Sequence, residues 1–438
     1  MAGGTWTLQN KARPGAYINF KAVPDPGDVT STRGVAAMPL VLNWGPEAQI
    51  IEVYSTDLTD GAISKKLGYN ANATEILQVR ECLKGCYKLL AYRVNTGGTA
   101  ASAELGSLTV TAKYPGIRGN DIQVGVLEKG VSYDIITYLD NAEVDRQQVT
   151  AISELVNNDF VEFRGTGDLS TQAVTKLTGG INGSSPIANY ESFFELLKTQ
   201  SWQVMGLPID DNAITTAAVA AIRGMREELG KKVQAVVYNT TADYEGIISV
   251  KQGYRTDGET ISAVDFVAYA TGISAGAEIP QPNTYREIEG ASTIINPMSD
   301  AEITAALEQG FMVISRRTDG VIVIEQDINT LVTFTADRPK AFCKNRLIRT
   351  LDEIANTTCR LFENSFLGKV NNDITGRELF KQALGKELKS LQDLGAIEGF
   401  NTDDIAVSAG AADDSVVVTM AVNPVDAMEK LYITVEVN

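Results

Sequence analysis

The chain has 438 residues, 44% of them hydrophobic, which is enough for about two to four domains with their own cores. Its 38 basic and 55 acidic residues give a net charge of −17, which repels phosphate backbones and argues against nucleic-acid binding. The chain contains no histidine, which excludes Ser-His-Asp and Cys-His hydrolases and imidazole-ligated metals. Neither a long apolar run nor a secretory signal is present, so we expect cytoplasmic synthesis without membrane insertion.

Residues 1–33 are expected to form an extended N-terminal arm. Pro14, Gly15, Pro24, Pro26 and Gly27 interrupt any helix there, although residues 16–20 can form one short strand. From residue 34 short apolar segments alternate with amphipathic ones, which indicates an α/β domain over 34–104. The expected strands are 35–42, 50–54 and 87–94, and the expected helix is 74–84.

Between residues 105 and 184 the helical periodicity disappears, and short strands separated by Gly, Asn and Asp turns predict an inserted antiparallel β-domain, a small sandwich or barrel. The expected strands there are 108–112, 122–127, 133–139 and 161–164. The α/β pattern resumes over 185–330. Its expected elements are helices 190–199, 215–229, 263–275 and 301–309 and strands 203–208 and 233–238. Ser299 and Glu302 form a capping box, and Arg317-Thr318-Asp319-Gly320 marks a hairpin between 311–315 and 321–326.

Residues 331–438 are expected to form a C-terminal α+β domain. Asp337-Arg338-Pro339 predicts the start of a long helix, and Thr375 with Glu378 predicts a second capped helix that stops at Gly395. Strands at 415–422 and 432–437 are expected to close the chain.

The four cysteines are expected to be buried free thiols. Cys82 and Cys86 lie four residues apart in a predicted helix, where a disulfide has poor geometry, and Cys343 and Cys359 lie sixteen apart in another. Without a Cys-x-x-Cys or histidine partner, a zinc site is not expected.

The segments that come nearest to cofactor-binding or catalytic motifs have the wrong spacing or the wrong residue types. Gly224 and Gly230 before Lys231-Lys232 are one residue too far apart for a phosphate loop, and Lys232 replaces the required Ser or Thr. Three adjacent acidic pairs are interpreted as solvated loop residues rather than metal ligands: Asp210-Asp211, Asp403-Asp404 and Asp413-Asp414. We therefore expect no enzyme, cofactor or metal, although a Ser-Lys hydrolase could be recognised only by geometry.

Several segments resemble contractile phage tail sheath proteins, such as those of myophages and R-type bacteriocins. Arg13-Pro14-Gly15-Ala16-Tyr17 resembles the family's Pro-Gly-Val-Tyr opening, with alanine in place of valine. The strongest similarities are Ala112 to Asp121, containing Pro115-Gly116 and Gly119-Asn120-Asp121, and Leu177-Thr178-Gly179-Gly180 with Gly183. Gly34-Val35-Ala36-Ala37, Trp44-Gly45-Pro46, Lys66-Leu67-Gly68 and the closing segment from Asn423 to Val435 are also similar to family segments.

The resemblance implies a structural subunit that polymerises as a helical stack of hexameric rings around an inner tail tube and contracts. It implies as partners other copies of the chain, the inner tail tube protein, and baseplate and tail terminator proteins. The implied location is the tail of a virion or prophage-derived particle, assembled in the bacterial host cytoplasm. The alternatives are another phage assembly protein, such as a baseplate component, and, further off, an α/β enzyme.

The chain ends are the candidate intersubunit strands. Leu431, Ile433, Val435 and Val437 alternate with polar or aromatic residues at one end, and Tyr17, Ile18 and Phe20 lie in the short strand at the other. Either segment can add to a neighbour's sheet edge, although pairing within the same subunit is the alternative. The arm's 24–28 segment, rich in proline and glycine, would serve as the hinge.

The C-terminal domain carries an excess of positive charge. Residues 338–392 contain 11 basic and 6 acidic residues, a balance of +5 in an otherwise acidic chain. A basic face would hold an acidic inner tube through a salt-sensitive contact. Arg377, Lys381 and Lys386 are the candidate tube-contact residues, and a solvated helix face beside Glu378 and Glu387 is the alternative.

Overall fold

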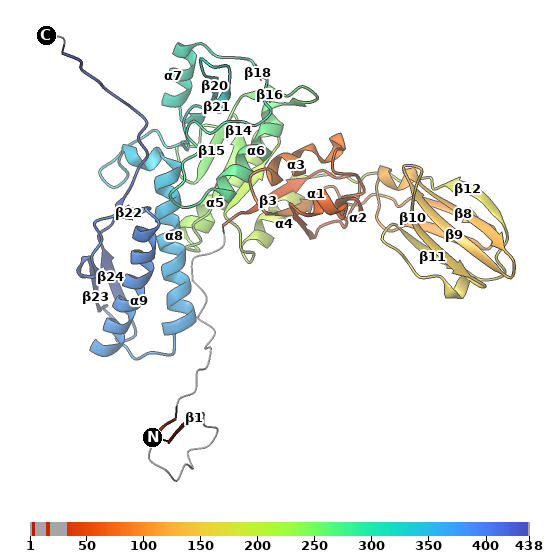
Figure 1. Cartoon of the computed structure of the whole chain (residues 1–438), viewed down its shortest axis with the longest axis horizontal. Coiled ribbons are helices and arrows are strands. Elements are labelled where there is room, and N and C mark those ends of the chain that lie inside the picture. Colours follow the sequence, from red (N-terminus) through yellow and green to blue (C-terminus); the bar gives the residue numbers. More distant parts are fainter. Residues whose placement is uncertain (1, 5–14, 18–32, 437–438) are drawn as a thin grey trace. The chain divides into compact units, whose positions relative to one another are not determined.

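The computed structural model describes residues 2–4, 15–17 and 33–436 (Figure 1). They fall into two compact units. The larger unit comprises residues 33–356, 391–400 and the chain from 421 onward, and the smaller one comprises 357–390 and 401–420 together with the described N-terminal residues. Both units contain helices and strands, so the expected mixed α/β and α+β fold class is confirmed.

Within the described residues, a seven-stranded sheet forms the centre of the larger unit (Figure 1). The strand order is β19-β15-β14-β13-β3-β5-β4, and neighbours are parallel except that β4 runs antiparallel to β5. The strands are β3 (Val35–Leu40), β4 (Ile50–Tyr54), β5 (Lys88–Arg93), β13 (Val204–Leu207), β14 (Gln234–Tyr238), β15 (Ile247–Val250) and β19 (Phe311–Met312). Strand β3 is buried along its whole length, as expected for a parallel strand covered on both faces.

Helices cover both faces of this sheet. Helices α3 (Leu77–Leu83) and α6 (Ala263–Gly276) pack over the face that carries Met38, and α4 (Ile187–Leu197) and α5 (Asn212–Glu227) pack over the face that carries Ala37. Two short helices, α1 (Asp57–Asp60) and α2 (Ile63–Leu67), follow β4. The expected helices and strands of this body are therefore present, and α1, α2 and β15 are additions that the sequence analysis did not predict.

Two glycines allow α6 to approach the end of α3 closely. A Cβ atom on Gly272 would lie 1.9 Å from the carbonyl oxygen of Cys82, and one on Gly276 would lie 1.8 Å from that of Gly85. Real Cβ atoms do not come this close, so this main-chain contact requires glycine at both positions.

The thiols differ from the expectation. Cys82 and Cys86 are buried and free, with their sulfur atoms 3.7 Å apart, and burial raises the pKa of the Cys82 thiol. Cys343 is only half-buried and Cys359 is exposed, so the expectation of burial is wrong for these two. Cys359 lies in the last turn of α8 (Asn345–Leu361).

Residues 102–176 form the inserted β-sandwich (Figure 1). Among the described residues, a four-stranded sheet, β10-β9-β8-β12, packs on a three-stranded sheet, β11-β7-β6, around a core that includes Val110, Val124 and Val161. The strands are β6 (Ser102–Leu105), β7 (Leu108–Ala112), β8 (Ile122–Lys129), β9 (Ser132–Leu139), β10 (Ala142–Val149), β11 (Val161–Gly165) and β12 (Gln172–Lys176). The four expected strands are present, whereas β6, β10 and β12 were not predicted.

The two chain segments that lead into and out of the sandwich pair with each other. Main-chain hydrogen bonds join Thr96 to Ser184, Thr99 to Ile181 and Ser102 to Thr178 in both directions, with donor–acceptor distances of 2.8 to 3.1 Å. We call this two-stranded connection the neck. Gly183 is required in it, because a Cβ atom there would lie 2.0 Å from the carbonyl oxygen of Thr96.

Smaller elements complete the larger unit. Ser299 and Glu302 form the predicted capping box of α7 (Asp300–Glu308), and β20 (Ile314–Arg316) and β21 (Ile322–Ile324) form the predicted hairpin. Further short strands are β16 (Gly253–Arg255), β17 (Thr260–Ile261), β18 (Thr293–Ile295), β22 (Ile397–Glu398) and β25 (Asn423–Pro424).

Two predicted helix starts in the C-terminal region are wrong. Pro339 precedes a 3-10 turn, Lys340–Cys343, and α8 begins at Asn345, whose side chain and main-chain N–H both bind Asp327. Helix α9 (Ile374–Asp393) begins before Thr375, and the Asp373 carboxylate accepts a 2.8 Å hydrogen bond from the N–H of Gly376. Aspartate caps a helix as well as threonine does, and Asp373 comes before Thr375 in the chain, so the helix begins earlier than predicted.

The smaller unit packs aromatic rings between its helices. Phe362 and Phe366, in the π-helical turn that continues α8, lie 5.6 and 4.8 Å from Phe380 of α9 by ring centroids. Strands β23 (Ile405–Ala409) and β24 (Val416–Met420) form a hairpin in place of the single expected strand at 415–422.

Candidate assembly sites

The C-terminal segment is attached to the larger unit through Glu429. Its carboxylate accepts hydrogen bonds from Thr284 Oγ1 at 2.9 Å and Gln326 Nε2 at 2.8 Å, and it forms an ion pair with Lys344. Burial raises the pKa of Glu429, but the hydrogen bonds from Lys344 and Gln326 outweigh it and leave the pKa below its ordinary value. We call Glu429 with these three partners the C-terminal anchor.

Next to the C-terminal anchor lies an open groove of about 860 Å³. Residues from α7, the segments 282–285 and 325–334, and the C-terminal segment 427–430 line it. Tyr285, Val332 and Phe334 expose apolar surface in its wall. The chain therefore leaves the body beside an exposed apolar surface.

Beyond Glu429 the chain is exposed. Leu431, Ile433 and Val435 are 72 to 82% exposed, and Tyr432 between them is 88% exposed. The predicted closing strand is wrong for the described residues 432–436, which adopt neither strand nor helix (Figure 1), and Val437 lies outside the described residues. The alternation of residue types is present, but a β-strand needs a hydrogen-bonding partner, and the described residues supply none.

At the other end, Tyr17 lies in a short strand, β2 (Gly15–Tyr17), which pairs in parallel with β1 (Ala2–Gly4). Tyr17 is opposite Gly4. Ile18, Phe20 and the 24–28 hinge segment lie outside the described residues. The described part of the arm thus pairs locally, as the intramolecular alternative expects, and its role toward a neighbour stays a prediction.

The three candidate tube-contact residues lie on α9 in different environments. The guanidinium of Arg377 donates to the main-chain and side-chain oxygens of Asn372 at 3.1 and 2.9 Å, which ties it to its own loop. Lys381 is half-buried and lies 3.8 Å from the exposed Asp403. Lys386 is exposed. The geometry therefore separates a structural residue, Arg377, from the more available Lys386.

The motifs that carry the family resemblance meet at the neck. Asn120 and Gly180 form a reciprocal pair, in which Asn120 Nδ2 donates to Gly180 O at 2.9 Å and Gly180 N–H donates to Asn120 Oδ1 at 2.8 Å. Gly116 has a φ of 133° and lies against the carbonyl oxygen of Asn43, where no Cβ atom would fit. The motif residues thus hold the sandwich on the body.

The other motifs have local structural roles. Asp211 caps α5 by accepting hydrogen bonds from the N–H groups of Ala213 and Ile214. Lys231 donates to the carbonyl oxygens of Leu197 and Gln200 at the end of α4 and lies over the Trp202 ring. The part of the chain that the structure describes holds no cluster of three or more potential metal ligands. No helix among the described residues is long and apolar enough to cross a membrane.

Four family models together match most of the chain. They are the tail sheath protein Gp18 domain III N-terminal region (33–94), the phage tail sheath protein beta-sandwich domain (96–182), the phage tail sheath protein central domain (185–330) and the phage tail sheath C-terminal domain (337–438). The order of these domains follows the architecture described above.

Individual relatives agree with the family models. The chain is 34% identical to the phage-like element PBSX protein XkdK of Bacillus subtilis (strain 168) over the full length of both chains. It is 37% identical to the sheath tail protein of Desulfitobacterium hafniense, whose crystal structure superimposes with a TM-score of 0.84 over 96% of this chain and 99% of that one. The contracted helical sheath of the anti-feeding prophage shares the fold alone, with 14% identity and a TM-score of 0.55 over 97% of this chain and 100% of that one.

These similarities define a structural protein of phage-type tails. The chain belongs to the phage tail sheath protein family.

Proposed function

We propose that this chain is the subunit of a contractile sheath that polymerises helically, in stacked hexameric rings, around an inner tail tube. The observation that carries the proposal is the C-terminal segment: it is held at Glu429, and the next residues expose an alternating apolar face. A free segment of this kind gains main-chain hydrogen bonds and apolar burial when it adds to a sheet edge of another copy. Open helical growth follows when two different patches meet head to tail.

The β23–β24 hairpin is a suitable acceptor for such a segment. Both of its strands have an unpaired edge among the described residues, and Val417 of β24 is 51% exposed. The N-terminal arm, including Tyr17, Ile18 and Phe20, would contribute a second exchanged strand.

Contraction would draw its free energy from the contacts between copies. If the extended lattice is kinetically trapped, a more favourable packing in the shorter lattice drives the change without a nucleotide. A few kcal/mol per subunit is enough, because many subunits change together.

Lys386 and Lys381 of α9 would contact an acidic inner tube, and the contact would weaken as salt rises. Baseplate and tail terminator proteins would close the two ends of the polymer. Assembly would take place in the host cytoplasm before the virion tail is complete.

Electron microscopy of concentrated protein tests the proposal. The full chain should form open tubes, and a variant that lacks residues 431–438 should remain a folded, soluble subunit that forms none. Closed rings from the full chain would instead support the alternative of a baseplate component. Tubes from the truncated chain would contradict the role of the C-terminal segment.

A further inference from the structure

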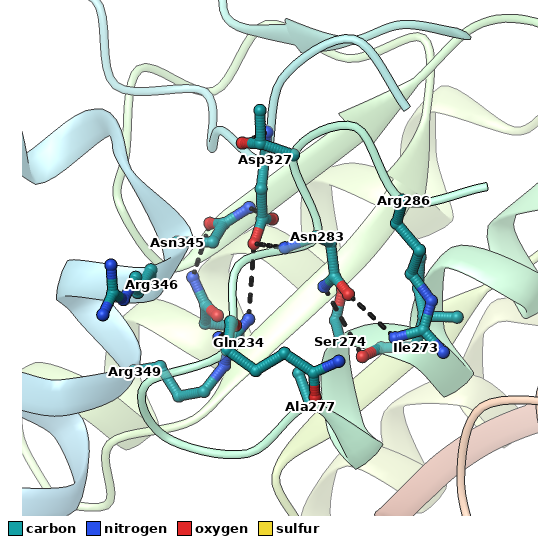
Figure 2. Close-up of polar contacts among 12 residues, drawn as sticks. Gln234, Ile273, Ser274, Ala277, Asn283, Arg286, Asp327, Asn345, Arg346 and Arg349 are labelled. Atoms are coloured by element: carbon teal, nitrogen blue, oxygen red, sulfur yellow. Dashed lines mark hydrogen bonds and ion pairs between the residues drawn. The ribbon is translucent and has the colours of Figure 1, made fainter. Parts of the chain in front are cut away.

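A set of buried polar contacts around Asp327 lies between the C-terminal anchor and Arg33, and Figure 2 shows its central part. On the C-terminal side, the Thr284 hydroxyl donates to Glu429 and accepts a 3.0 Å hydrogen bond from the N–H of Asp327. This hydroxyl is therefore both a hydrogen-bond donor and a hydrogen-bond acceptor. The C-terminal anchor is thereby one hydrogen bond away from Asp327.

Asp327 lies at the centre of the network and is 2% exposed (Figure 2). Its carboxylate accepts hydrogen bonds from Asn283 N–H at 3.0 Å, from Asn345 Nδ2 at 2.8 Å and from Arg349 at 3.4 Å. The three donors come from the loop after α6 and from the first turns of α8. Asp327 therefore joins its own segment to two others, the loop after α6 and the start of α8.

Arg349 continues the network toward the N-terminal side. Its guanidinium donates to the carbonyl oxygens of Gln281 and Glu278, in the loop that follows α6. The same loop begins at Ala277, whose carbonyl oxygen accepts a 2.9 Å hydrogen bond from Arg33 Nε. A second, 3.5 Å bond joins Arg33 to Ser274 O. The loop is thus held by Arg349 on one side and by Arg33 on the other.

Arg33 is the first residue of the described body after the N-terminal arm. Burial and, to a smaller extent, the nearby positive charge of Arg349 together lower its pKa to about 10. The two guanidinium groups bind different carbonyl groups of one short segment, 274–281, and repel each other. A shift of this segment at one guanidinium therefore changes the hydrogen-bond geometry at the other.

We propose that the path Glu429–Thr284–Asp327–Arg349–Arg33 couples the C-terminal anchor to the root of the N-terminal arm. Release of either chain end then loosens the attachment of the other. This inference rests on the proposed function, because the coupling would make the two exchanged segments respond together when neighbouring subunits move.

Hydrogen–deuterium exchange on the unassembled full-length subunit tests the coupling. Glu429→Gln weakens the C-terminal anchor, and Arg33→Lys weakens the arm root while it keeps the positive charge. We expect Glu429→Gln to raise the exchange rate of residues 270–280, and Arg33→Lys to raise that of residues 421–430, each by at least about threefold. The effects should be similar in both directions, because coupling between two sites is reciprocal.

Thr284→Val removes the shared hydroxyl and leaves Glu429 its bonds to Lys344 and Gln326. In this background the remote effects should disappear. The matched control is Thr240→Val, a half-buried threonine whose hydroxyl binds only the Tyr238 carbonyl among the described residues; it should preserve them.

The proposal would be overturned if neither Glu429→Gln nor Arg33→Lys changed the exchange rate at the remote segment. It would also be overturned if these substitutions had the same remote effects in the Thr284→Val background. The experiment uses single subunits, so its result is separate from tube formation. The proposed function fails only if the full chain forms no tubes.

Discussion

Arg226 and Asp352 form a buried, two-pronged ion pair in which Arg226 Nη1 and Nη2 lie 2.6 and 2.8 Å from the two carboxylate oxygens. It joins the end of α5 to the first half of α8, and Arg226 also donates to the Val233 carbonyl. We predict that Asp352→Asn lowers the free energy of unfolding by about 3–5 kcal/mol, because it leaves a buried guanidinium without its counter-charge.

Urea unfolding followed by circular dichroism measures this change. Asp319→Asn is the control, since its ion pair with Arg317 is exposed to solvent and its loss should lower the free energy of unfolding much less. Equal effects of the two substitutions would show that the buried pair contributes no more than a surface pair.

The packing of α6 on α3 makes a second prediction. Gly272→Ala would place a Cβ atom 1.9 Å from Cys82 O, so the helices must separate. We expect the free energy of unfolding to fall by about 1–3 kcal/mol or more. Gly224→Ala in α5 is the matched control, because its Cβ atom would meet nothing within 4 Å. The free energy of unfolding of the Gly224→Ala variant should rise by about 0.4–1 kcal/mol, because alanine has a higher helix propensity than glycine. Thermal melts of both variants compare them, and a stable Gly272→Ala protein would contradict the close contact.

The C-terminal anchor should open at acidic pH. Because the folded pKa of Glu429 lies below its ordinary value of 4.5, its contribution is complete above that pH and is lost as the pH falls through the folded pKa. The intrinsic rate of amide exchange itself slows as the pH falls, so protection relative to that rate is compared. The protection of residues 421–430 should decrease as the pH falls below 4.5. In Glu429→Gln the protection should already be lower at neutral pH, and this additional decrease should be missing. The same pH profile in both proteins would assign the change to other groups.

Substitutions on the two faces of the terminal segment test strand exchange. In the unassembled subunit Ile433 is 72% exposed, and Thr434 beside it is also exposed, so neither substitution should change subunit stability. In an exchanged strand successive side chains point to opposite faces. Ile433→Asp should therefore abolish tubes, and Thr434→Asp should permit them. Tubes from both variants, seen by electron microscopy, would exclude a buried apolar face.

The tube contact can be tested by charge reversal on α9. We expect Lys386→Glu to weaken binding of the inner tube protein and to reduce the salt dependence of that binding. Arg377→Gln should instead loosen the loop that carries Asn372, with a smaller effect on tube binding. Co-sedimentation at several salt concentrations distinguishes the two. Unchanged binding for Lys386→Glu would favour the alternative of a solvated helix face.

Much of the fold could be predicted because local pattern and tertiary structure agree. The apolar strands and amphipathic helices of the central body are examples. Strand β10 was missed because five of its eight side chains are charged or amide groups, so its sequence lacks apolar alternation and its place comes from pairing with β9. The start of α8 was misplaced because Asp327, outside the helix, fixes Asn345.

The candidate sites were less predictable, because they depend on contacts between distant residues. Glu429 and Lys344 are 85 residues apart, and the sequence around each gives no sign of the other. The terminal alternation of apolar residues did indicate an adhesive segment, but a sequence pattern does not say which chain supplies the partner.

The neck gives the sandwich an entrance and an exit that lie side by side. A short turn between Thr96 and Ser184 could therefore close the gap if the intervening residues were excised, and the sheet behind it would keep its order. Because the two connecting segments lie side by side, a different module could be inserted at this position. The sandwich is therefore replaceable by another module whose two ends lie equally close together, with the strand order of the body unchanged.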